Sequence, residues 1–169
     1  QTDKSVVALL RLRQYWSEEE RMQRIAAMLG EARLSQSAVA RCLPALLVAL
    51  DWFGPPRTLV PSMPPVEAGF EVQDLRTLLA DIGYRSDYLG ATFHELLLDE
   101  LPIGTLAISD DSCQVFLGRY EDSYWWHDGD QLVADWQPPA DTRFLLIQQK
   151  AGFTPIDAPQ ADWLLRLLG

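Results

Sequence analysis

Apolar positions in the first thirty residues follow a helical spacing. One helix is predicted over residues 6–16. A second helix is predicted to begin at Ser17, because Ser17 and Glu20 have the spacing of a capping box, and to end at Gly30. The chain therefore opens with two short helices in this prediction.

Residues 35–54 are apolar almost all round, which is typical of a helix at the centre of a small domain. Pro44 is predicted to lie in the first turn of this helix or to mark its true beginning, since proline fits the start of a helix. The proline-rich residues 54–69 predict an irregular connection with a single short turn.

Two more helices are predicted before the pattern changes. Residues 72–82 place their apolar side chains on one face, and Gly83 ends that helix. Residues 92–102 predict a short helix, with Thr92 and Glu95 in capping-box spacing and Pro102 at its end.

From Gly104 onward the apolar period becomes two, or the apolar runs become short. Five strands are predicted, most simply as an antiparallel meander, from the segments GTLAIS, QVFLGRY, SYWWHD, QLVADW and RFLLIQQ. Residues 151–169 predict a linker marked by proline and then the start of an apolar helix. Helices followed by a sheet indicate the α+β class.

The composition limits the functions to be considered. A chain of 169 residues with 48% hydrophobic residues is long enough for one core and too short for two ordinary domains. Its 24 acidic and 14 basic residues give a formal charge of -10, and the arginines are scattered, so nucleic acid is not expected as a partner.

Two cysteines, Cys42 and Cys113, stand alone in the sequence, without a CxxC or histidine-rich spacing, so neither a zinc site nor a redox motif is predicted. Phosphate-binding glycine motifs and the HExxH motif are also absent, and no cofactor is expected in this chain. The chain has no apolar stretch of membrane-spanning length and begins with Gln rather than Met, which suggests a piece of a longer protein.

The order of several segments resembles a known family. The central helix leads to an aromatic–Gly pair, and it is followed by DLRTLLADIGY, then LPIGTLAI, and then a strand pair that ends in an Asp. This order and spacing resemble the papain-like cysteine peptidase domain of bacteriocin-processing ABC transporters over about residues 35–149. The resemblance implies a papain-like fold, with a helical half followed by an antiparallel sheet.

The resemblance also implies where the catalytic residues of the family would lie. The nucleophile position falls on Arg41 or, with a slip of one residue, on Cys42. The base position falls on Cys113 or Ser112, and the position of the third residue on Asp128, with Asp130 as the weaker choice. The glutamine that completes the oxyanion hole in the family corresponds to Gln36.

No histidine occupies the base position. A cysteine nucleophile needs its thiolate, which an imidazolium normally stabilises, and the Asp of such a triad only orients the imidazole. His94 and His127 lie elsewhere in the pattern. The sequence therefore predicts a peptidase-like domain without catalytic residues.

Domains that have lost these residues resemble the N-terminal peptidase-like domains of type I secretion ABC transporters. The resemblance implies a domain at the cytoplasmic face of the bacterial inner membrane that docks an unfolded secreted substrate, such as a repeats-in-toxin protein or adhesin. Residues 1–34 would be a helical extension, residues 35–150 the peptidase-like domain, and residues 151–169 a linker toward a transmembrane region. The full-length protein would form a homodimer, bind ATP and magnesium, and use its own membrane and nucleotide-binding domains as partners.

The predicted binding surface is the former catalytic cleft and its rim. It comprises Arg41, Cys42, Cys113, Tyr124, Trp125, Trp126 and Asp128. In a strand, Trp125 and Trp126 face opposite sides, so one is expected in the core and the other exposed beside the groove; burial of both beneath helices is the alternative.

Two other functions stay open at this point. The first is an active cysteine peptidase that cleaves a leader peptide, with Cys42 as the nucleophile and His127 or His94 as a displaced base. The second is an architectural domain that contacts only the transporter. Reactivity of the Cys42 thiol and binding of unfolded substrate would separate these possibilities.

Overall fold

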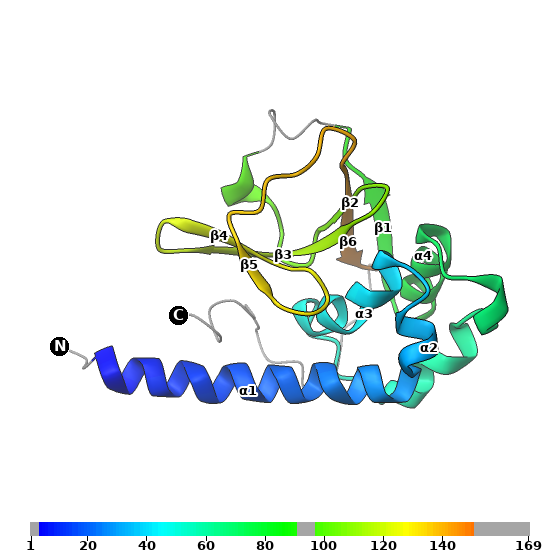
Figure 1. Cartoon of the computed structure of the whole chain (residues 1–169), viewed down its shortest axis with the longest axis horizontal. Coiled ribbons are helices and arrows are strands. Elements are labelled where there is room, and N and C mark those ends of the chain that lie inside the picture. The colour runs from blue at the N-terminus through cyan, green and yellow to red at the C-terminus, as the bar shows by residue number, and fades with distance from the viewer. Residues whose placement is uncertain (1–3, 91–96, 151–169) are drawn as a thin grey trace.

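The computed structural model describes residues 4–90 and 97–150, with side chains from Ser17 onward (Figure 1). Helices come first and an antiparallel sheet follows, so the predicted α+β class is confirmed. The helices are α1 (Lys4–Leu29), α2 (Glu31–Leu34), α3 (Ala38–Ala49) and α4 (Val72–Asp81), with 3-10 helices η1 (Pro56–Ser62), η2 (Val66–Ala68) and η4 (Leu98–Glu100). In the described part of the chain, no helix is both long and apolar enough to span a membrane.

The N-terminal segment is one helix, so the prediction of a new helix at Ser17 is wrong. A capping box begins a helix only where the preceding residues leave the helical conformation, and no Gly or Pro interrupts the chain before Gly30. The C-terminal half of α1 buries Met22, Ile25 and Leu29 in the same core as α3. The core thus continues across the predicted boundary at residue 34.

The central helix begins earlier than its proline suggests. Ser37 caps α3, and its hydroxyl accepts a hydrogen bond from the backbone N–H of Ala40 at 3.0 Å. Pro44 is therefore the seventh residue of α3 and lies inside the helix, not in its first turn. Burial of nearly the whole helix compensates for the backbone hydrogen bond that proline cannot make.

The connection after α3 contains two short helices, η1 and η2, rather than the single turn predicted. The helix predicted over residues 72–82 is confirmed as α4. Within the predicted helix 92–102, residues 92–96 lie outside the described residues, and the described part forms only the short η4. Residues 151–169 also lie outside them.

The sheet has six strands in the order β1-β6-β2-β3-β4-β5, all pairs antiparallel. They are β1 (Tyr84–Tyr88), β2 (Leu106–Ile108), β3 (Cys113–Tyr120), β4 (Ser123–His127), β5 (Leu132–Ala134) and β6 (Arg143–Gln149). The five predicted strands are present, but β1 was not predicted because its polar sequence YRSDY follows a helix end directly. The simple meander is also wrong, since β6 returns to pair between β1 and β2.

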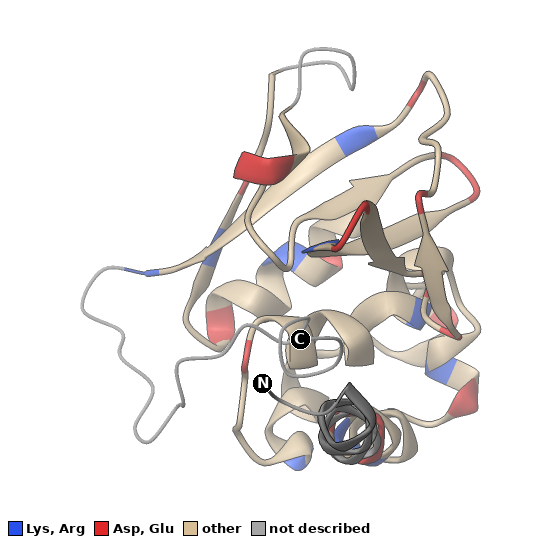
Figure 2. Cartoon of the chain, turned by 90° about the vertical axis from the view of Figure 1, so that its left-hand side faces the viewer, with Lys and Arg blue, Asp and Glu red and all other residues tan. Residues whose placement is uncertain are grey.

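The two faces of the sheet carry different cores. One face packs against α3 and α4, with α1 packed in turn against α3, and contributes aliphatic residues such as Leu106, Val115 and Leu145 to the larger core. The opposite face holds a smaller aromatic core of Leu101, Ala107, Phe116, Trp126 and Phe144. Most acidic residues described in the sheet half lie in its turns, not in its strands (Figure 2).

Candidate functional site

A groove runs along the boundary between the helices and the sheet, at the N-terminal end of α3. It consists of two pockets of about 450 and 260 Å³ that share Ser37, Ala38 and Ser112 in their walls. We call the larger the Arg41 pocket and the smaller the Tyr88 pocket. The walls come from the first turns of α3 and α4, the β2–β3 and β4–β5 turns, and the ends of β1, β2 and β6.

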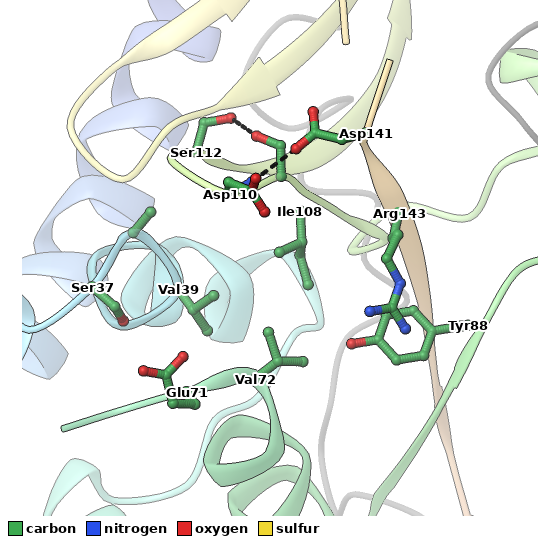
Figure 3. A pocket seen from close by; sticks show the side chains of 12 residues that line it. Ser37, Val39, Glu71, Val72, Tyr88, Ile108, Asp110, Ser112, Asp141 and Arg143 are labelled. Atoms are coloured by element: carbon green, nitrogen blue, oxygen red, sulfur yellow. Dashed lines mark hydrogen bonds between the residues drawn. The ribbon is translucent and has the colours of Figure 1, made fainter. Parts of the chain in front are cut away.

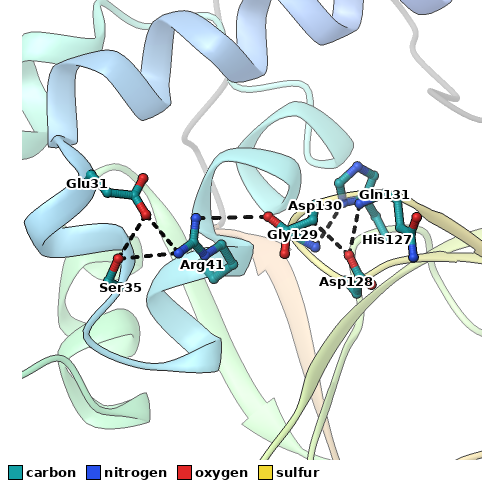
Figure 4. Close-up of polar contacts among 8 residues, drawn as sticks. All are labelled: Glu31, Ser35, Arg41, His127, Asp128, Gly129, Asp130 and Gln131. Atoms are coloured by element: carbon teal, nitrogen blue, oxygen red, sulfur yellow. Dashed lines mark hydrogen bonds and ion pairs between the residues drawn. The ribbon is translucent and has the colours of Figure 1, made fainter.

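Arg41 occupies one end of the groove and joins the helices to the sheet (Figure 4). Its guanidinium donates to Oε1 of Glu31 at 2.9 Å and to Oγ of Ser35 at 3.3 Å, and it lies 3.9 Å from Oδ1 of Asp130. Hydrogen bonds from Ser35 and Arg41 lower the pKa of Glu31. Arg41 is therefore a cationic link in the wall, and a guanidinium cannot act as a nucleophile.

Asp128 shapes the turn opposite Arg41. Its Oδ1 accepts the backbone N–H groups of Asp130 and Gln131 at 2.8 and 2.9 Å, while Gly129 has a φ of +101°. A Cβ on Gly129 would lie 2.6 Å from Cγ and 2.8 Å from the carbonyl oxygen of Arg41. Glycine is therefore required for both the conformation and the close approach of this turn to α3.

The predicted base position lies in the same pocket. Ser112 is half-buried in the wall, and its hydroxyl pairs with that of Ser109 at 2.5 Å. Cys113 also borders the pocket, but the residue is only 2% exposed. The structure thus brings Arg41, Ser112, Cys113 and Asp128 together around one pocket.

Cys42 follows Arg41 in α3 but is 1% exposed and belongs to the larger core. Its thiol donates a hydrogen bond to the carbonyl oxygen of Cys113 at 3.0 Å. Hydrogen bonding with Cys113 and burial raise the pKa of the Cys42 thiol well above its ordinary value. The predicted placement of Cys42 on the binding surface is corrected: it lies behind the groove wall, not on it.

The aromatic run of β4 lies away from the groove, which corrects its assignment to the binding surface. Trp126 is fully buried, packs edge-on against Phe116 and Trp136, and offers no contact surface. Tyr124 faces the same side of the sheet, where its hydroxyl donates to Oδ1 of Asp99 at 3.1 Å. Trp125 turns toward the helices and is partly buried against the larger core. None of the three β4 aromatics borders either pocket.

The remaining predicted residues are engaged elsewhere. Gln36 donates its side-chain amide to the carbonyl oxygen of Val66 instead of facing a pocket. His127 is 3% exposed, and its Nδ1 accepts the backbone N–H of Gly129 at 3.0 Å. Burial lowers the pKa of His127, against a smaller opposing effect of Asp128 and Asp130. His94 lies outside the described residues.

The Tyr88 pocket was not predicted from the sequence. Its walls carry Glu71, Asp110 and Asp141 together with Tyr88 and Arg143, which come from four separate stretches of the chain. Two signals were visible in the sequence: the acidic turn Asp110–Asp111 and the cap-like Glu71 before α4. Only the return of β6 beside β1 and β2 shows that these residues share one pocket.

No group of three or more His, Cys, Asp or Glu side chains suited to a metal ion occurs in the ranges 4–90 and 97–150. Comparison with protein-family models, with curated proteins and with solved structures found no match to this chain.

Proposed function

We propose that this chain is a catalytically inactive peptidase-like domain with a papain-like arrangement, and that its groove docks unfolded secreted protein at a type I secretion ABC transporter. The observation that carries the proposal is the convergence of Arg41, Ser112 and Asp128 on one pocket. These residues come from α3, the β2–β3 turn and the β4–β5 turn. The resemblance in sequence order assigns the nucleophile position to Arg41 or Cys42, the base position to Cys113 or Ser112 and the acid position to Asp128. Each position thus has a candidate residue in the wall of this pocket.

The chemistry of the pocket favours binding over peptide cleavage. The nucleophile position holds a guanidinium, and the thiol of the next residue in the helix, Cys42, is buried with a raised pKa. A thiol in that state is a poor nucleophile, because the thiolate is the attacking species. The ring of His127 is buried and accepts the backbone N–H of Gly129 through Nδ1. These contacts argue against the alternative of an active peptidase.

The shape of the groove fits an extended chain. Two pockets that share a wall provide successive sites for side chains of one segment, and the rim offers serine hydroxyls and carboxylates for hydrogen bonds. An unfolded polypeptide can present such a segment without losing structure of its own. The resemblance supplies the cellular setting of export.

A backbone NMR titration tests the proposal. The probe is an unfolded C-terminal segment of the secreted protein encoded beside this chain. We expect shifts at Ser37, Arg41 and Ser112 and no direct shifts at Tyr124, and the Ser112→Trp variant, which fills the wall shared by both pockets, should weaken binding about tenfold or more. The matched control is Ala134→Trp, on the exposed side of β5.

Two results would overturn the proposal. One is the absence of shifts at millimolar probe concentration, which would favour a purely architectural domain. The other is binding that Ser112→Trp leaves unchanged while both variants keep the wild-type spectrum of the core. The second result would place the docking surface outside the groove.

A further inference from the structure

The Tyr88 pocket combines an apolar floor with an acidic rim. Val39, Val72 and Ile108 point into its middle, while Glu71 lies on one side and Asp110 and Asp141 lie on the other (Figure 3). These three aliphatic residues come from α3, α4 and β2, so the floor is part of the helix–sheet boundary. The cavity volume is about 260 Å³, which suits one long side chain.

The rim carries more negative than positive charge. Three carboxylates face one guanidinium, that of Arg143, which stacks over the ring of Tyr88 at 3.8 Å. Among the described residues, Arg143 forms no ion pair with any of the three carboxylates. One oxygen of Asp141 accepts the backbone N–H of Asp110 at 3.2 Å, which orders the rim. The positive charge is therefore stacked on the Tyr88 ring, and the rest of the rim is acidic.

We propose that the Tyr88 pocket receives a lysine or arginine side chain of the docked peptide, so that the groove selects basic segments. The inference rests on the proposed function and specifies its substrate class. A lysine or arginine has an aliphatic stem and a cationic head, and such side chains bury the stem on apolar surface while the head stays near water. The stem would lie on Val39, Val72 and Ile108, and the head would reach Asp110, Asp141 or Glu71.

The other pocket of the groove has the same sign of charge. Arg41 there faces Asp111, Asp128 and Asp130. An acidic segment would therefore meet like charge along the whole groove, whereas a basic segment would meet opposite charge. Because the carboxylates lie at a solvent-exposed rim, the preference should weaken as salt screens it.

Three nine-residue Gly/Ser peptides that differ only at the central position test the inference on the 169-residue chain. The central residue is lysine, norleucine or glutamate, and affinities come from NMR titration at 50 mM salt. We expect the lysine peptide to bind about tenfold more tightly than the norleucine peptide, with shifts at Ile108 and Tyr88, and the glutamate peptide to bind most weakly. At 500 mM salt the lysine preference should fall to about twofold.

The double variant Asp110→Asn with Asp141→Asn should remove the lysine preference and leave binding of the norleucine peptide unchanged. Asp122→Asn is the matched control, because Asp122 is fully exposed in the β3–β4 turn and belongs to neither pocket. A lysine preference that survives the double variant would overturn the inference.

The outcomes also separate this inference from the proposed function. Equal affinity for the lysine and norleucine peptides, or no binding of any peptide while the secreted segment still binds in the groove, would refute the basic pocket alone. If neither the peptides nor the secreted segment binds to the chain, the docking function itself is refuted.

Discussion

Helix α3 borders two regions of opposite character. Behind it, Cys42 lies in an apolar core with Leu43, Leu46 and Leu47, none of them more than 1% exposed. In front of it, Arg41 lies in a polar groove among serine hydroxyls and carboxylates. Successive residues of a helix point about 100° apart, so a step of one residue moves a side chain from one region to the other.

This contrast shows why a slip of one residue matters for function. Under the proposed peptidase-like arrangement, the nucleophile position falls on Arg41 or Cys42, and the two side chains have different surroundings. Arg41 lines the groove, whereas the Cys42 thiol faces the core and donates to the carbonyl oxygen of Cys113. The groove and the core are therefore separate in role, although one helix carries both.

The largest expected effect comes from a change in the core. Leu46→Ala removes a fully buried side chain and should lower the free energy of unfolding by about 3 kcal/mol, because the cavity left behind cannot close completely. Urea denaturation followed by circular dichroism measures the loss. Arg41→Ala, which changes the groove side of the same helix, should cost less than half as much; equal costs would show that the two regions are not distinct.

An intermediate effect is expected where the two regions meet. Gly129→Ala places a methyl group against the backbone of Arg41 at a φ of +101°, and should cost about 2 kcal/mol through strain and displacement of the turn. Gly69→Ala is the control, because Gly69 has a φ of +80° but a Cβ there would meet no atom within 4 Å beyond its chain neighbours. Thermal unfolding compares the two, and a cost no greater than that of Gly69→Ala would mean that contact with Arg41 is unimportant.

A smaller effect is expected from pH. Burial lowers the pKa of His127 in the folded protein, whereas the pKa of a histidine in the unfolded chain is about 6.5, so the unfolded state binds the proton first as pH falls. Above the pKa of the unfolded state, the neutral His127 costs the folded protein nothing. As pH falls from that value toward the lower pKa of the folded state, the free energy of unfolding decreases by at most about 1.4 kcal/mol per pH unit. Urea midpoints between pH 8 and pH 5 measure this slope.

His127→Asn keeps an acceptor for the N–H of Gly129 and should flatten that part of the profile. Persistence of the full slope in the variant would assign the pH dependence to other groups. Protonation of Nδ1 would remove the hydrogen bond from Gly129, which supports the turn that approaches Arg41. As pH falls, this turn of the groove should therefore lose its order at a higher pH than the core unfolds.

Much of the local structure could be predicted from the sequence. The period of apolar residues identified α4, the buried central helix and five strands, because burial against a core imposes a repeat on each element. The predicted helix start at Ser17 was wrong because the residues of a capping box can also lie inside a longer helix. Strand β1 was not predicted because its sequence is mostly polar and it becomes a strand only by pairing with β6.

The candidate site was predicted in part. Arg41, Ser112 and Asp128 share a pocket, but Trp126 lies in the aromatic core on the far face of the sheet. Alternation predicted that Trp125 and Trp126 face opposite sides, without showing what covers each side. That depends on which elements pack on the sheet.

The sequence by itself determined the α+β class and the acidic charge, since these follow from residue types and their local spacing. Only the tertiary structure decided which neighbour of α3 faces the groove and which residues form the Tyr88 pocket. The physical reason is that both depend on contacts between distant segments. The return of β6 between β1 and β2, and the close approach of Gly129 to Arg41, bring those segments together.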